Sequence, residues 1–215
     1  QPLVEMLQFN LYHTYTEDEH TILTISHLAA IERGELIEEL PVASGILDDG
    51  LNRKVLYIAL LLHDIGKGRS DDHSVLGAKI AREVAPRLGL KPREVETVEW
   101  LVRYHLLMSD MAQKRDIADP RTVRDFAKAV QSVRRLDLLT VLTVCDISGV
   151  GPGVWNNWKA VLIRALYRQT KKALETGLED LNRENRGTEA KKNLRIRLTD
   201  WPKLALRHET NRHYP

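Results

Sequence analysis

Apolar residues recur every three or four positions through most of the 215-residue chain, a pattern that predicts a succession of helices. Helix-capping residues stand at several of the expected starts, including Thr16 with Glu19 in a capping box, Ser74, and Asp119 before Pro120. No alternation of strands with helices is present, so the sequence predicts an all-α fold. We expect helices at about 16–33, 52–62, 74–87, 92–105, 119–130, 133–148 and 155–183.

In two stretches between these helices, apolar residues do not recur at a clear helical spacing. Residues 34–51 and 106–118 contain Pro, Gly or many polar residues, and we expect them to be connections, with room for one helical turn in the first. The last helix is expected to pack through a stripe of apolar residues, namely Trp158, Val161, Leu162, Ala165 and Leu166.

Histidines occupy inward positions on several of the expected helices. His20 precedes Leu23 on a face that also carries His27, and His105 ends the apolar face of the helix at 92–105. His73 stands at the start of the helix expected at 74–87. A single histidine on an apolar face is usually a satisfied core residue. Taken one at a time, these positions therefore leave packing and metal binding both open, with His27 the weaker ligand candidate.

The most unusual stretch is residues 60–68, with the sequence LLLHDIGKG. Burying His63 and Asp64 side by side at a helix end is costly unless a cation binds them. Gly66 allows a tight turn, and Lys67 can reach an anion such as a phosphate. An ordinary glycine-capped helix end is the alternative interpretation.

Asp146 is a second anomaly, because it interrupts a nearly continuous apolar run from Leu138 to Ile147. An ionised carboxylate in such a helix costs several kcal/mol unless a cation, or a basic side chain, neutralises it. The joint occurrence of imidazole and carboxylate groups without cysteine ligands favours a divalent transition metal. We expect a mixed ligand set with open positions, which is typical of catalytic sites.

The composition agrees with a helical protein that has an aliphatic core. Hydrophobic residues make up 43% of the chain but aromatic residues only 6%. The net charge of +2 indicates neither a nucleic acid nor a membrane surface as partner. Residues 183–215 are an exception, with nine Lys or Arg and four Asp or Glu. We therefore expect a domain at 1–183 followed by a basic linker or tail at 184–215.

The cysteine content and the length of the apolar runs indicate in which cellular compartment the protein is expected. The single cysteine, Cys145, excludes an internal disulfide and a cysteine-rich zinc site. No apolar run reaches the ~18 residues of a membrane span, and no signal-peptide pattern opens the chain. We expect a cytoplasmic protein, and a first residue other than Met suggests a piece of a longer one.

Four stretches together resemble a known family. They are residues 12–21 (YHTYTEDEHT), 63–68 (HDIGKG), 72–74 (DHS) and 101–109 (LVRYHLLMS). With the order His20, His63-Asp64, Asp146, they resemble the HD superfamily of metal-dependent phosphohydrolases. More narrowly, residues 9–179 are similar to the HD domain of bifunctional uridylyltransferase/uridylyl-removing enzymes, which modify the nitrogen regulatory protein PII.

This resemblance implies a helical bundle with a metal site between its helices. It implies a divalent metal (Mn, Fe, Zn, Co or Mg, as one or two ions) and a role for each candidate residue. His20, His63, Asp64 and Asp146 would hold the first ion, and His73 and His105 would bind a second ion or the phosphate. Asp64 and Lys67 would serve catalysis directly.

The function implied by the resemblance is removal of UMP from a uridylylated tyrosine of PII, a phosphodiester hydrolysis in the regulation of nitrogen metabolism. No Gly-Ser with Asp-x-Asp pattern supplies a nucleotidyltransferase site, and the family's glutamine-sensing ACT domains are missing from the sequence. Three alternatives stay open. They are a nucleotidase or nucleotide phosphohydrolase acting on a free small molecule, a non-catalytic metal-bound regulatory module, and a helical interaction domain with buried histidines.

Overall fold

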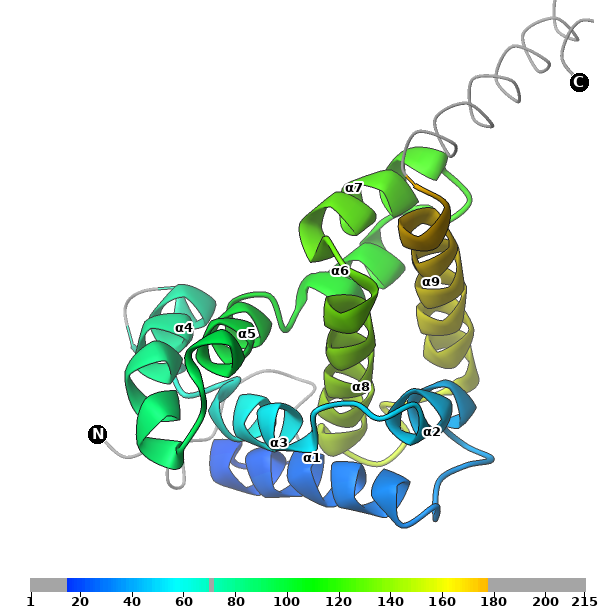
Figure 1. Ribbon diagram of the computed structural model, residues 1–215. Helices are drawn as coiled ribbons and strands as arrows, with labels where there is room; N and C mark the ends of the chain where they lie inside the picture. The colour runs from blue at the N-terminus through cyan, green and yellow to red at the C-terminus, as the bar shows by residue number, and fades with distance from the viewer. Residues whose placement is uncertain (1–14, 70–71, 178–215) are drawn as a thin grey trace, which may run out of the picture.

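The computed structural model describes residues 15–69 and 72–177, and every regular element in these ranges is helical (Figure 1). The all-α prediction is therefore confirmed. No helix in the described ranges is long and apolar enough to cross a membrane. The elements are α1 (Glu17–Glu32), α2 (Pro41–Asp48), α3 (Arg53–Leu62), α4 (His73–Val84), the 3₁₀ helix η1 (Ala85–Leu88), α5 (Pro92–Arg103), α6 (Leu107–Lys114), α7 (Pro120–Val130), α8 (Val133–Gly149) and α9 (Asn157–Thr176).

Helix α8 forms the centre of the fold. It contacts α1, α2 and α3 as well as α5, α6, α7 and α9, while α4 and α5 pair to one side of it (Figure 1). Apolar residues on all sides of α8 are buried, as expected of a helix surrounded by others. Because α1, α3 and α8 meet near their ends, polar side chains placed in their terminal turns come together inside the bundle.

The structure contains two helices where connections were expected, so those two predictions were wrong. Helix α2 begins with Pro41 in its first turn and buries Ile46 and Leu47. Helix α6 buries Met108 and Ala112, which lie one turn apart. Each helix has only eight residues, which is two turns, and so short an element shows too few repeats for its period to stand out.

Helix α4 begins one residue earlier than the sequence suggested. The Asp72 side chain, and not Ser74, caps it by accepting hydrogen bonds from the backbone N–H groups of Ser74 (2.9 Å) and Val75 (3.2 Å). His73 is consequently the first residue of the helix. The predicted helix at 74–87 ends as the separate 3₁₀ turn η1, because Pro86 cannot donate the next helical hydrogen bond.

The packing face of α9 also differs from the expected stripe. Trp158 and Val161 are each 58% exposed, whereas Ile163, Leu166 and Tyr167 face the core. The buried face is therefore rotated from the predicted one, and only Leu166 of the expected stripe is fully buried. The apolar content of α9 exceeds what one face needs, so its pattern alone did not identify the buried side.

Two glycines permit close approaches beside the charged helix ends. A side chain at Gly66 would collide with the backbone carbonyl of His73 and lie 2.8 Å from the backbone nitrogen of Gly77. At Gly149 a Cβ would lie 2.6 Å from Cγ2 of Thr24. The first glycine seats the turn that follows α3 against α4, and the second brings α8 against α1.

Gly66→Ala should lower the free energy of unfolding by about 1–3 kcal/mol, because the added methyl group has backbone rather than a flexible side chain in its way. Urea denaturation of both proteins would measure the difference. Gly45→Ala in α2 is the matched control, since nothing lies within 4 Å of its Cβ position. That variant should be neutral or slightly more stable. Equal stability of the Gly66 and Gly45 variants would contradict the close approach.

Candidate metal centre

Three side chains from different helices converge on one point. His20 lies in the first turn of α1, His63 directly follows α3, and Asp146 lies in the last turn of α8. Nε2 of His20 is 3.2 Å from Nε2 of His63 and 3.0 Å from Oδ1 of Asp146. His63 Nε2 is 3.6 Å from the same Oδ1. Both histidines are buried and the Asp146 side chain is 15% exposed.

These separations fit a shared metal ion. Nitrogen and oxygen ligands held about 2.1 Å from one ion lie roughly 3.0–3.4 Å apart. The three distances within this group run from 3.0 to 3.6 Å. Two imidazoles and a carboxylate are also donors that suit a divalent transition metal.

The imidazoles of His63 and His105 are oriented by backbone carbonyls. Nδ1 of His63 lies 2.7 Å from the carbonyl oxygen of Leu60, and Nδ1 of His105 lies 2.8 Å from that of Val102. A carbonyl only accepts, so in both rings Nδ1 is the donor. In the neutral ring the Nε2 lone pair is then free to bind a metal, the arrangement typical of metal-ligating histidines.

A second group of donors adjoins the first. One ligand atom each of Asp64, His73 and His105 lies within 4.8 Å of the other two. Oδ1 of Asp64 and Nε2 of His73 are buried, and neither has a hydrogen-bond partner in the described ranges; the Asp64 atom is 3.6 Å from Nε2 of His105. Buried polar atoms nearly always have a partner, and a bound cation would satisfy both.

Lys67 joins this centre to α1 through an ion pair that the sequence analysis did not find. Its Nζ is 2.7 Å from Oδ2 of Asp64 and 3.0 Å from Oε2 of Glu17. The Lys67 side chain is only 9% exposed and that of Glu17 only 3%. Glu17 precedes His20 by three residues and so lies on the same face of α1, a spacing that could have identified it.

The electrostatics of the centre favour added positive charge. Burial alone would lower the pKa of His63, but the charges of Asp64 and Asp146 raise it well above its usual value. Burial alone would raise the pKa of both carboxyl groups. The charge of His63 instead lowers that of Asp64, and hydrogen bonds with His20 and His63 lower that of Asp146. Two buried carboxylates thus attract a proton into the space between them, and a divalent cation would satisfy them in its place.

The structure brings seven of the candidate residues named from the sequence into one region, which is formed by His20, His63, Asp64, Lys67, His73, His105 and Asp146. His27 lies outside it, and its Nδ1 is 2.8 Å from the carbonyl oxygen of Leu23 in its own helix. Tyr12, His13 and Thr14, which open the first resembling stretch, lie outside the described residues.

Comparisons with known proteins agree with the resemblance found in the sequence. The HD domain family matches residues 18–142. A "Bifunctional uridylyltransferase/uridylyl-removing enzyme" of Ruegeria pomeroyi is 72% identical over the whole chain, and one of Cereibacter sphaeroides is 71% identical over 99% of it. A protein of the same name from a Bradyrhizobium species is 50% identical. The chain spans 24%, 23% and 23% of these relatives, about a quarter of their length.

His63→Ala should reduce the metal content of the purified protein at least tenfold, because it removes one of the three donors that converge on one point. Inductively coupled plasma mass spectrometry after loading with a single metal and gel filtration would measure this content. His27→Ala is the matched control, since it removes a histidine from outside the converging group. Metal content that stayed unchanged in His63→Ala, or fell equally in both variants, would refute the assignment.

Proposed function

Because this chain belongs to the HD domain family of metal-dependent phosphohydrolases, we propose that it hydrolyses the phosphodiester between UMP and a tyrosine of the regulatory protein PII. The observation that carries the proposal is the convergence of two donor groups at the helix ends, with a largely buried lysine paired to Asp64. The names of the three relatives support the uridylyl-removing reaction over other phosphohydrolase reactions.

The proposed ligand assignment follows the two groups. His20, His63 and Asp146 would hold one divalent ion, with Asp64 at its edge, since Oδ2 of Asp64 lies 3.1 Å from Nε2 of His63. His73 and His105 would hold a second ion, with Oδ1 of Asp64 as a further ligand, or would contact the phosphate. A divalent ion bound here supplies Lewis acidity at the phosphoryl oxygen and lowers the pKa of a coordinated water. We propose Mn, Fe, Zn, Co or Mg as the metal.

Asp64 and Lys67 have distinct roles in this proposal. Lys67 holds Oδ2 of Asp64, which leaves Oδ1 to bind the second ion or, where His73 and His105 contact the phosphate instead, to orient the attacking water. The Lys67 ammonium also offsets negative charge that grows on the phosphoryl group. Glu17 keeps this ammonium in place from the opposite side.

The reaction balances with water as the only co-substrate. The water oxygen forms a bond to phosphorus as the bond from phosphorus to the tyrosine oxygen breaks. The phenolate takes up a proton, and the products are UMP and an unmodified tyrosine. No group becomes oxidised or reduced.

The proposal also includes the domain organisation, the regulation and the compartment of the enzyme. Residues 1–183 would be the catalytic domain, and the basic segment 184–215, which lies outside the described residues, would lead to further domains. Glutamine-sensing ACT domains beyond it would regulate a cytoplasmic enzyme. A nucleotidase acting on free nucleotides would use the same ligand set, so only the substrate separates that alternative.

The chain should hydrolyse bis(p-nitrophenyl) phosphate when a single divalent metal is restored after chelation, because the centre is complete within residues 20–146. Release of p-nitrophenolate with Mn, Fe, Co, Zn or Mg measures the rate. Uridylylated PII is the next substrate, with UMP release quantified by chromatography. Hydrolysis of free UMP to uridine, with no UMP released from PII, would instead establish the nucleotidase. A metal-loaded chain that hydrolyses none of these substrates would refute the phosphohydrolase activity of this chain.

Lys67→Ala should lower kcat about 100-fold while the metal content stays unchanged, because the ammonium contacts a ligand but is not itself one. Steady-state kinetics and metal analysis on the same preparation measure both. Lys54→Ala is the control, since that lysine donates to the carbonyl of Gly89 at the surface. If metal content fell together with kcat, the lysine would be structural rather than catalytic.

A further inference from the structure

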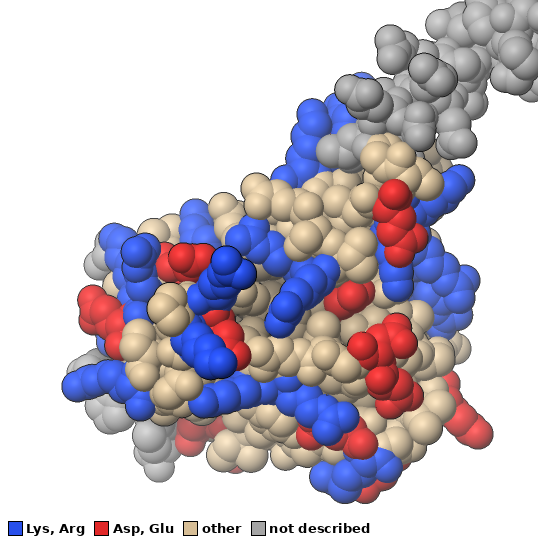
Figure 2. All heavy atoms as spheres, viewed as in Figure 1, with Lys and Arg blue, Asp and Glu red and all other residues tan. Residues whose placement is uncertain are grey.

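A hollow of about 410 Å³ lies between α4, α5 and the beginning of α8. Figure 2 shows Lys and Arg side chains gathered on this face of the molecule, around the depression over these helices. Its size is within the range of small-molecule binding pockets. The candidate ligands do not line it, so it is a feature separate from the metal centre.

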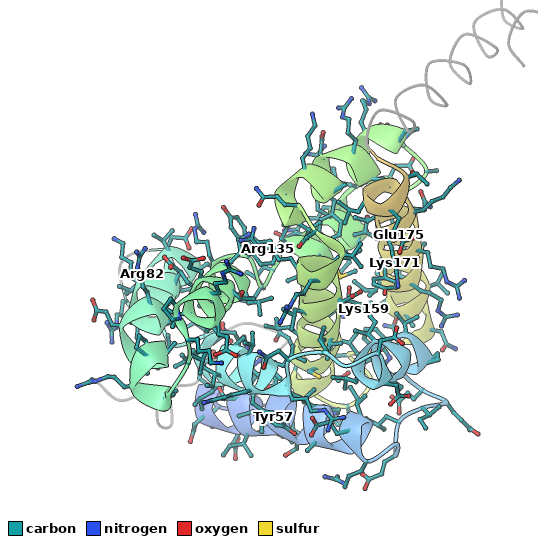
Figure 3. The ribbon with its side chains drawn as sticks, in the orientation of Figure 1. Tyr57, Arg82, Arg135, Lys159, Lys171 and Glu175 are labelled. Carbon is teal, nitrogen blue, oxygen red and sulfur yellow. The ribbon has the colours of Figure 1, made fainter. Side chains whose placement is uncertain are left out.

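One wall of the hollow is a row of planar groups. The guanidinium of Arg135 lies 4.9 Å from the ring centre of Trp100, and this ring is 5.4 Å from that of Tyr104. The guanidinium of Arg103 in turn lies 5.6 Å from the Tyr104 ring. Figure 3 shows Arg135 reaching from α8 toward α5. The Tyr104 side chain is 40% exposed, so part of its surface remains open to a ligand.

The chemistry of this wall suits a nucleotide. Aromatic rings and guanidinium planes stack on nucleobases, and each such stack contributes appreciably to binding. Arg103 and Lys79 supply positive charge for a phosphate. Glu96 and Glu99 also line the hollow, and Glu99 is 3.5 Å from Arg82 in an ion pair. A carboxylate here can accept a hydrogen bond from a ring N–H, which uracil carries.

The hollow adjoins, along the chain, two residues of the second donor group, since both use α4 and the end of α5. Helix α4 begins with His73 and supplies Val75 and Lys79 to the hollow. Tyr104, at the end of α5, directly precedes His105. A nucleoside monophosphate is much longer than its phosphate group, which the metal centre would hold. Its base therefore needs a surface next to that centre.

We propose that this hollow binds the nucleoside part of the phosphodiester substrate, with the base stacked against Tyr104 and Trp100 and the guanidinium of Arg135 beside them. The inference rests on the proposed phosphodiester hydrolysis and adds to it the surface that selects a nucleotide ester over other esters.

Two chromogenic substrates test the proposal directly, the p-nitrophenyl ester of UMP and bis(p-nitrophenyl) phosphate. They share a leaving group and differ in the nucleoside. Tyr104→Ala and Arg135→Ala should raise KM for the UMP ester about tenfold and leave the hydrolysis of the other ester unchanged. Arg93→Ala is the matched control, because it removes the same charge from α5 at an exposed residue outside the hollow.

Calorimetric titration with UMP separates a failure of this inference from a failure of the proposed function, since binding requires no turnover. The unmodified chain should bind UMP, and the Tyr104 and Arg135 variants should bind it about tenfold more weakly. Ribose 5-phosphate, which lacks the base, should bind equally to all of them. Two results would overturn the proposal, whether or not the chain is an active hydrolase. They are equal binding of UMP by every variant, and an equal loss of hydrolysis of both esters in the variants.

Discussion

Compensation of two buried carboxylates is the constraint on which the rest of this structure depends. Asp64 and Asp146 lie close to the same two imidazoles, and Asp64 also has a lysine beside it. Taking such charges out of water costs several kcal/mol each unless cations and hydrogen bonds replace the lost hydration. The helix ends, the backbone carbonyls that orient His63 and His105, and the glycines that let α3 approach α4 and α8 approach α1 all place groups around these charges.

The two oxygens of the Asp64 carboxylate have different surroundings and can therefore have different roles. Oδ2 of Asp64 is held by Lys67, while Oδ1 has no hydrogen-bond partner among the residues described. Glu17 extends the network by fixing the lysine from α1, so the position of the Asp64 carboxylate depends on contacts with a second helix. A network of buried charges of this kind is stable only when each member is satisfied, which makes its geometry well defined.

Sequence reasoning was most successful where one residue contradicted its surroundings. Asp146 in an apolar helix and His63-Asp64 at an apolar helix end indicated a shared cation because burial of an uncompensated charge is costly. The long helices were predictable from their period. The eight-residue helices α2 and α6 were not predictable from their period, because their formation depends on the tertiary packing of a few residues, such as Met108 and Ala112 in α6. Glu17 was missed because its place in the first turn of α1 already accounted for an acidic residue there.

The separation of the donors along the chain makes the metal centre a property of the folded state alone. His20 and Asp146 are 126 positions apart, and His63 is 43 positions from His20. An unfolded chain holds no such constellation, so a divalent ion that binds here acts as a reversible cross-link among three distant segments. Its concentration then adds to stability as RT ln(1 + [L]/Kd), about 2.7 kcal/mol at one hundred times Kd. Metal bound in this way would contribute to the stability of the domain as well as to its chemistry.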